Sequence, residues 1–292
     1  MDKVSELLRG SIDVHVHSGP GVIPRSLDHF EAVQHCIHAG MRALVVKDQH
    51  GMTCNQVYFL KKYLFKDSPI QIFGGITLNN ATGGINVFAV DTAITYGAKI
   101  VWMPTVSAKN HIEWHKKETS FFTQYERKDF PEAPLTILDG EGKLLPQVSQ
   151  ICKLIAKADI ILGTGHLYLK EIKLLVDEAL KQGVKKILMQ HPQFVVNASI
   201  DDMIQFANKG VFIEQSYGGR ISGKLSKEDL VELIRNVGAE RMVIGSDLGQ
   251  MGRIYPVQGF RDCIKELLEA GIKEGEIDFM LRRNPAKLLN LD

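Results

Sequence analysis

The sequence predicts an α/β protein in which eight parallel strands and their helices close into a (β/α)8 TIM barrel. Short β-branched runs recur along the chain, each followed by a turn-forming cluster and then by a segment of helical periodicity. These runs are apolar on both faces, as strands are when helices cover one side of a parallel sheet and packed side chains fill the other. The length of 292 residues would allow two domains at ~150 residues each, but single barrels reach ~250 residues. We therefore expect one domain over residues 1–292.

Each element of the barrel has its own signal in the sequence. Strands are expected at 11–17, 43–48, 71–78, 99–105, 160–166, 186–191, 211–216 and 242–247. Between them, apolar residues recur at three- and four-residue steps, as in the stripe of Leu27, Phe30, Val33 and Ile37, which predicts helices. A doubly wound open sheet is the alternative. It is disfavoured because residues 18–22, after the first strand, do not form a G-x-G-x-x-G turn that opens a helix.

One segment, from 106 to 146, breaks the alternation of strand and helix. It is rich in aromatic and charged residues, and connections of this length in a compact domain are usually functional or disordered. Because it follows the fourth strand, it should project from the C-terminal face of the barrel, where active sites lie. We interpret it as a lid or substrate wall, with a surface excursion or subunit contact as the alternative.

Composition restricts the classes of partner. With 35 Lys+Arg and 34 Asp+Glu, the net charge of +1 gives no reason to expect nucleic acid or an anionic membrane. No apolar run approaches the ~20 residues of a membrane span, and the first residues lack the apolar centre of a signal peptide. The four scattered cysteines indicate a reduced, cytoplasmic protein. We expect a small-molecule substrate and leave a homo-oligomer open.

Side chains that can bind a metal fall at the C-terminal ends of four predicted strands. His15 and His17 end the first strand, His166 the fifth, His191 the sixth and Asp247 the eighth. His15 and His17 are two residues apart, so they point the same way. A lone histidine is more often a satisfied polar residue than a ligand. Five such residues at equivalent strand ends instead predict one metal site at the barrel mouth.

The chemistry of these side chains indicates which metal they would bind. Imidazole nitrogen and carboxylate oxygen suit zinc, with manganese, iron or cobalt as alternatives, and one or two ions per chain are expected. A metal with an open coordination position would acidify a water molecule and polarise a scissile carbonyl.

This arrangement resembles the amidohydrolase superfamily, and residues 283–289 resemble its Asn-Pro-Ala closing helix. The resemblance implies that His15, His17 and Asp247 hold a buried metal, and that His166 and His191 hold an outer one. In single-metal members His166 joins the first three, and His191 orients water or substrate. Asp247 would also act as the general base.

The sequence departs from the family pattern at the fourth strand. Two-metal members usually take a bridging carboxylated lysine or glutamate from the end of this strand, and residues 100–105 supply neither. Lys47, at the end of the second strand, is the candidate for a carbamate bridge, because an amine at the barrel mouth needs a partner. The alternatives are a lysine paired with Asp48 or Asp247, and a lysine that contacts substrate.

Five further residues are candidates for contacting substrate. Tyr217 and Arg220 lie in a glycine-rich loop after the seventh strand, where Arg220 would clamp a substrate carboxylate. Arg25 follows the His-x-His pair, and His50 adjoins the end of the second strand. His111 belongs to a His-x-Glu-x-His spacing in the 106–146 segment. A solvated or packed role is the alternative for each of them.

Taken together, these features predict a metal-dependent hydrolase of an amide, cyclic amide, lactone or other ester, with Asp247 as general base and His191 in the catalytic set. A single-metal decarboxylase with the same ligands is the first alternative, and a catalytically silent metal-binding barrel is the second.

Overall fold

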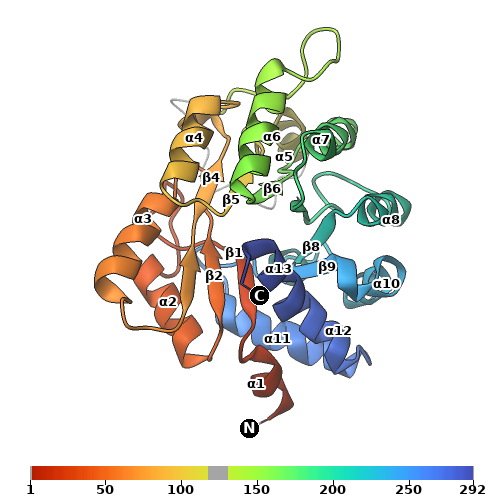
Figure 1. Cartoon of the computed structure of the whole chain (residues 1–292). Coiled ribbons are helices and arrows are strands. Elements are labelled where there is room, and N and C mark those ends of the chain that lie inside the picture. Colours follow the sequence, from red (N-terminus) through yellow and green to blue (C-terminus); the bar gives the residue numbers. More distant parts are fainter. Residues whose placement is uncertain (1, 118–130, 292) are drawn as a thin grey trace.

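The computed structural model describes residues 2–117 and 131–291, and within them the predicted barrel is present (Figure 1). Parallel strands form its wall, and helices ring them on the outside. The strands are β1 (Ile12–Val16), β2 (Ala43–Val46), β3 (Gln71–Phe73), β4 (Gly75–Thr77), β5 (Ile100–Trp102), β6 (Ile161–Gly163), β7 (Ile187–Gln190), β8 (Phe212–Ser216) and β9 (Met242–Gly245).

Helices follow the strands in the alternating order that the sequence predicts. The α-helices are α1 (Lys3–Leu8), α2 (His29–His38), α3 (Cys54–Phe59), α4 (Val87–Thr95), α5 (Lys109–Lys117), α6 (Pro146–Ala158), α7 (Leu169–Lys181), α8 (Ile200–Asn208), α9 (Tyr217–Ile221), α10 (Lys227–Val237), α11 (Pro256–Glu269), α12 (Glu274–Asp278) and α13 (Asn284–Leu289). Short helical turns are η1 (Leu60–Leu64), η2 (Asn80–Thr82), η3 (Ala239–Arg241) and η4 (Phe279–Arg283).

The third strand position differs from its prediction, because it is divided into β3 and β4 at Gly74. β3 pairs with β2, and β4 pairs with β5. A Cβ at Gly74 would lie 2.6 Å from the backbone carbon of Thr53, so only glycine fits where the chain passes this closely.

Hydrogen bonds between the first and last strand positions close the barrel. The amide of Asp247 donates to the carbonyl of His15 (2.8 Å), and the amide of His17 donates to the carbonyl of Leu248 (2.9 Å). Asp13 Oδ1 accepts from the amides of His15 and Ser246, each at 3.0 Å. The seam is therefore held by backbone pairing and by a buried carboxylate.

Alternate strand positions divide the apolar side chains into two layers. The inner layer contains Ile12, Val14, Ala43, Val45, Phe73, Ile100, Trp102, Ile161, Leu188, Phe212 and Val243. Residues of α13 pack against this layer, which leaves the C-terminal ends of the strands for polar side chains. The outer layer lies between strands and helices and makes up most of the core.

An irregularity in β1 changes which face of the strand points inward. The pairing with β2 shifts between Asp13 and Val16. Ile12 and Val14 belong to the inner layer, whereas Val16 belongs to the outer layer. A bulge of this kind exchanges the two faces of a strand. It is the reason that His15 and His17 reach the barrel mouth although Ile12 and Val14 already point inward.

The segment predicted as a lid contains a helix, α5, rather than loop alone. Asn110 at the start of α5 donates from Nδ2 to the carbonyls of His166 (3.1 Å), Leu167 (3.2 Å) and Val195 (3.0 Å). These bonds attach α5 to the loops after β6 and β7. Residues 118–130, which include part of the predicted lid, lie outside the described residues.

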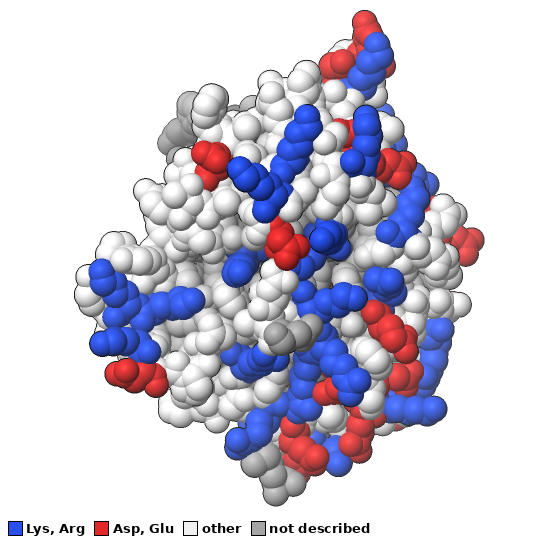
Figure 2. All heavy atoms as spheres, viewed as in Figure 1, with Lys and Arg blue, Asp and Glu red and all other residues white. Residues whose placement is uncertain are grey.

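Charged side chains of both signs are interspersed on the face shown in Figure 2. This mixture agrees with the near-zero net charge of the sequence. Over the described ranges, no helix has both the length and the apolar character needed to cross a membrane.

Candidate metal centre

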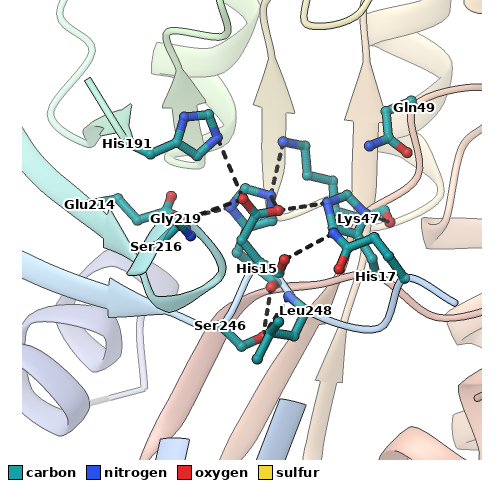
Figure 3. A network of polar contacts seen from close by, with 12 residues as sticks. His15, His17, Lys47, Gln49, His191, Glu214, Ser216, Gly219, Ser246 and Leu248 are labelled. Carbon is teal, nitrogen blue, oxygen red and sulfur yellow. Dashed lines mark hydrogen bonds and ion pairs between the residues drawn. The ribbon is translucent and has the colours of Figure 1, made fainter. Parts of the chain in front are cut away.

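Three of the predicted ligands meet at the barrel mouth, at the seam between β1 and β9. Asp247 Oδ1 lies 3.0 Å from His17 Nε2 and 3.3 Å from His15 Nε2. One ligand atom from each of the three residues lies within 4.8 Å of the others. The two imidazoles are buried and Asp247 is partly buried. Figure 3 shows His15 at the centre of this network, next to His17 and Lys47.

The other two predicted histidines lie beside this cluster. His191 Nε2 is 3.8 Å from Asp247 Oδ2, and the ring centroids of His191 and His15 are 5.8 Å apart. The centroids of His166 and His191 are 4.9 Å apart. The structure therefore brings together the five residues expected at the strand ends.

His15 on β1 and His17 directly after it are each held by a bond from Nδ1, which leaves Nε2 facing Asp247. His15 Nδ1 lies 2.5 Å from Glu214 Oε1, and His17 Nδ1 lies 3.2 Å from the carbonyl of Lys47. Such partners commonly orient metal-binding histidines and set their tautomers. Sequence reasoning missed Glu214, although a carboxylate inside the apolar run of β8 was a signal for it.

Burial keeps the imidazoles of His15, His17 and His191 neutral. Burial lowers the pKa of His15 and His17 to about 3 and that of His191 to about 4. Burial acts to raise the pKa of Asp247, but the nearby imidazoles, His15 foremost, hold it well below its ordinary value. Neutral imidazoles and an ionised carboxylate are the forms that bind a metal.

Lys47 lies against the same cluster. Its side chain is buried, and Nζ is 3.0 Å from His15 Nε2 and 5.4 Å from the centre of the Trp102 ring. Burial lowers the pKa of this amine. Trp102 ends β5 and occupies the region of the strand from which a bridging lysine or glutamate was expected and not found.

Three of the five substrate-contact candidates lie near the cluster or contact the 106–146 segment. Arg25 and His111 lie close to residues of the cluster, and His50 contacts the segment. Arg25 donates from Nη2 to Gln49 Oε1 at 2.7 Å. Burial lowers the pKa of Arg25, while the charges of Asp48 and Asp247 act to raise it. His50 Nε2 is 3.8 Å from Glu132 Oε1, a residue of that segment. His111, on α5, is buried with its Nδ1 2.8 Å from His166 Nδ1.

The structure does not bring Tyr217 and Arg220 to the cluster. Arg220 Nε donates to Glu266 Oε2 on α11 at 3.1 Å. Tyr217 is buried in the outer apolar layer. Because the loop after β8 folds into α9, these side chains turn towards α11. The structure therefore does not place Arg220 where it could clamp a substrate carboxylate at the cluster.

The residues present fit a divalent cation. Two Nε2 atoms converge on one carboxylate oxygen, which is the donor set that zinc and related metals prefer. Within the described residues, His166 Nε2 and His191 Nδ1 are buried and have no hydrogen-bond partner. Buried polar atoms are rarely left without a partner in native proteins, so these nitrogens are available to a ligand.

Solved structures of similar fold include hydrolases and decarboxylases. An amidohydrolase from Pseudomonas aeruginosa is 15% identical, with 98% of each chain covered and a TM-score of 0.65. A mutant organophosphorus hydrolase is 14% identical, with 98% of this chain and 94% of that chain covered and a TM-score of 0.63. A dihydroxybenzoic acid decarboxylase from Polaromonas, with bound manganese, is 12% identical, with 97% of each chain covered and a TM-score of 0.58.

These likenesses confirm the barrel fold that the sequence resemblance implied. No curated protein matches the sequence significantly. A family model described as a family of unknown function, DUF6282, matches residues 10–214, which is more than half of the chain. The protein is therefore a member of the DUF6282 family, and its fold is a (β/α)8 barrel.

Proposed function

We propose that the protein is a metal-dependent hydrolase of an amide, cyclic amide, lactone or other ester bond. The observation that carries this proposal is the convergence of His15, His17 and Asp247 at the mouth of the barrel. The amidohydrolase and organophosphorus hydrolase of similar fold support the same reaction class. The four free cysteines are buried, which agrees with a reduced, cytoplasmic setting.

His15, His17 and Asp247 would hold the first metal, and His166 and His191 would complete the site or hold a second ion. Zinc suits these donors, and the manganese in the Polaromonas decarboxylase supports manganese as an alternative. When bound, a divalent metal supplies Lewis-acid polarisation of a carbonyl and lowers the pKa of water.

The two carboxylate oxygens of Asp247 have different neighbours, which suits a general base. Oδ1 faces His15 and His17. Oδ2 accepts a hydrogen bond from Ser216 Oγ at 3.1 Å and lies 3.8 Å from His191 Nε2. We propose that Oδ2 takes the proton of the attacking water and returns it to the leaving group. Ser216 and His191 would hold this oxygen in place during the transfer.

Arg25 indicates the class of substrate. Its guanidinium is only partly exposed and interacts with the charge of Asp247, and its Nε has no hydrogen-bond partner among the described residues. A buried donor without a partner is costly, so the arrangement favours an anionic group on the substrate. We propose a small molecule that carries a carboxylate near the bond to be cleaved.

A second candidate function, decarboxylation, is favoured by one specific observation. β5 ends in Trp102 and provides no bridging carboxylate, as expected of a single-metal site. The dihydroxybenzoic acid decarboxylase of similar fold supports this alternative. Under it, Arg25 would hold a substrate carboxylate beside the metal ligands.

Metal content and product analysis together test the proposal. Protein purified without chelator is expected to contain one or two equivalents of zinc or manganese, and His17→Ala to contain less. The metal-loaded wild-type protein should then hydrolyse some members of a panel of carboxylated lactones, cyclic amides and amides. Release of carbon dioxide from aromatic acids without hydrolysis would favour the decarboxylase, and failure to bind any divalent metal would overturn both functions.

A further inference from the structure

We infer that His111 is a positioning residue that holds His166 with its Nε2 directed at the metal. The inference rests on the proposed metal centre and adds a residue from α5, outside the strand ends. The two Nδ1 atoms are 2.8 Å apart, which is hydrogen-bonding distance, so one imidazole donates its Nδ1 proton to the other.

The other histidines of the site indicate which ring is the donor. His15 and His17 both use Nδ1 for a fixed partner and direct Nε2 towards Asp247. His166 follows the same pattern if its Nδ1–H donates to His111 Nδ1. Its Nε2, which is buried and has no hydrogen-bond partner within the described residues, then keeps a lone pair for the metal.

The hydrogen bonds of Asn110 and the packing of neighbouring rings hold His111 in place for this contact. Asn110, the preceding residue, bonds the carbonyl of His166 itself and two further carbonyls in the loops after β6 and β7. His111 is buried, with its ring 4.8 Å from that of His166, centre to centre, and 6.2 Å from that of Trp114. The partner of His166 is therefore fixed by the same helix that enters the 106–146 segment.

Carboxylates and backbone carbonyls usually orient metal-binding histidines. Here Glu214 orients His15, and the Lys47 carbonyl orients His17. An imidazole in this role must itself be held in one tautomer. The rival arrangement makes His111 a direct ligand, with both Nδ1 atoms on one cation. It requires His166 to bind through Nδ1, so the two arrangements differ in the identity of the coordinating nitrogen.

Zinc binding by a series of variants tests the role of His111. His111→Leu should weaken zinc binding roughly 10- to 100-fold, the usual cost of losing such a partner. His111→Asn, which offers an oxygen near the Nδ1 position, should retain affinity within about threefold by the same reasoning. His29→Asn is the matched control, because His29 is buried and bonded to Ser18 and Gln56 outside the site. Equal losses for His111→Asn and His111→Leu would contradict the inference.

NMR of the zinc-loaded protein with ¹⁵N-labelled histidine identifies the coordinating atom directly. We expect His166 to show a zinc-bound Nε2 and a protected Nδ1 proton, which His111→Leu should remove and His111→Asn should keep. A zinc-bound Nδ1 on His166, or no zinc on His166, would overturn the inference while leaving the metal centre intact. Wild-type protein without bound zinc would instead contradict the proposed function.

Discussion

His191 and Asp247 adopt backbone conformations that their residue types rarely occupy. Their φ angles are +24° and +51°. His191 directly follows β7, and Asp247 is the second residue after β9. A non-glycine residue in this region costs about 1–3 kcal/mol and persists where its surroundings impose it. Such positions cluster at functional sites. The local strain at these residues thus agrees with their proposed roles beside the metal.

Replacement of Asp247 separates folding from turnover. In the presence of chelator, Asp247→Asn should fold and melt within a few degrees of wild type. With metal, its kcat should fall at least about 10³-fold, because an amide neither accepts the proton nor binds metal as a carboxylate does. Asp91→Asn, at an exposed position on α4, should change neither property. Steady-state kinetics and thermal melts measure both, and near wild-type turnover would remove Asp247 from the mechanism.

Lys47 is the candidate for a bridging anion at the site. If Lys47 carries a carbamate, Lys47→Ala should lower the metal content from two ions towards one per chain, and a short-chain acid should partly restore it. If its amine contacts substrate instead, metal content should stay constant while KM rises. Elemental analysis of both proteins, with Lys61→Ala on η1 as control, distinguishes the two roles.

At the scale of elements, the site depends on close approaches of backbone around the strand ends. The bulge in β1 turns two histidines inward, and the turn after β6 places His166. Gly165, in that turn, has a φ of +66°, and a Cβ there would lie 2.4 Å from the carbonyl oxygen of Pro104. The loop can therefore present His166 only with glycine at this position.

Gly165→Ala should accordingly destabilise the fold and impair metal binding together. We expect unfolding free energy to fall by about 3 kcal/mol or more, from strained backbone and overpacking. Gly183→Ala is the matched control, because Gly183 also has positive φ (+86°) but nothing lies within 4 Å of its Cβ position, so the loss should be about 1 kcal/mol. Urea unfolding and zinc titration measure the two effects. Equal losses in both variants would show that the close contact with Pro104 is unimportant.

At the scale of the molecule, the candidate ligands come from distant parts of the chain. Three lie at the seam between β1 and β9, and two lie in the loops after β6 and β7. A metal bound only by the folded barrel should therefore stabilise the whole domain. At free metal about 1,000 times Kd, the gain is about 4 kcal/mol, or roughly 10 °C in Tm. Thermal melts with zinc and with chelator measure the shift. His15→Ala should reduce it strongly, and an equal shift in that variant would place the stabilising metal elsewhere.

The sequence by itself determined the barrel, the strand positions apart from the division of the third at Gly74, and the five side chains at the strand ends. These features are local, because apolar runs, helical periodicity and turn residues are properties of neighbouring positions along the chain. Since the C-terminal ends of parallel strands share one face, His15, His17, His166, His191 and Asp247 could be placed together without knowing any side-chain contact.

Only the tertiary structure decided which distant side chains meet. The bond from His15 to Glu214, the pairing of His111 with His166 and the turn of Arg220 towards Glu266 join residues that are 199, 55 and 46 positions apart. Such contacts depend on strand register, on the β1 bulge and on how α5, α9 and α11 pack. None of these leaves a periodic trace in the sequence, because register and docking are fixed by packing of the whole core.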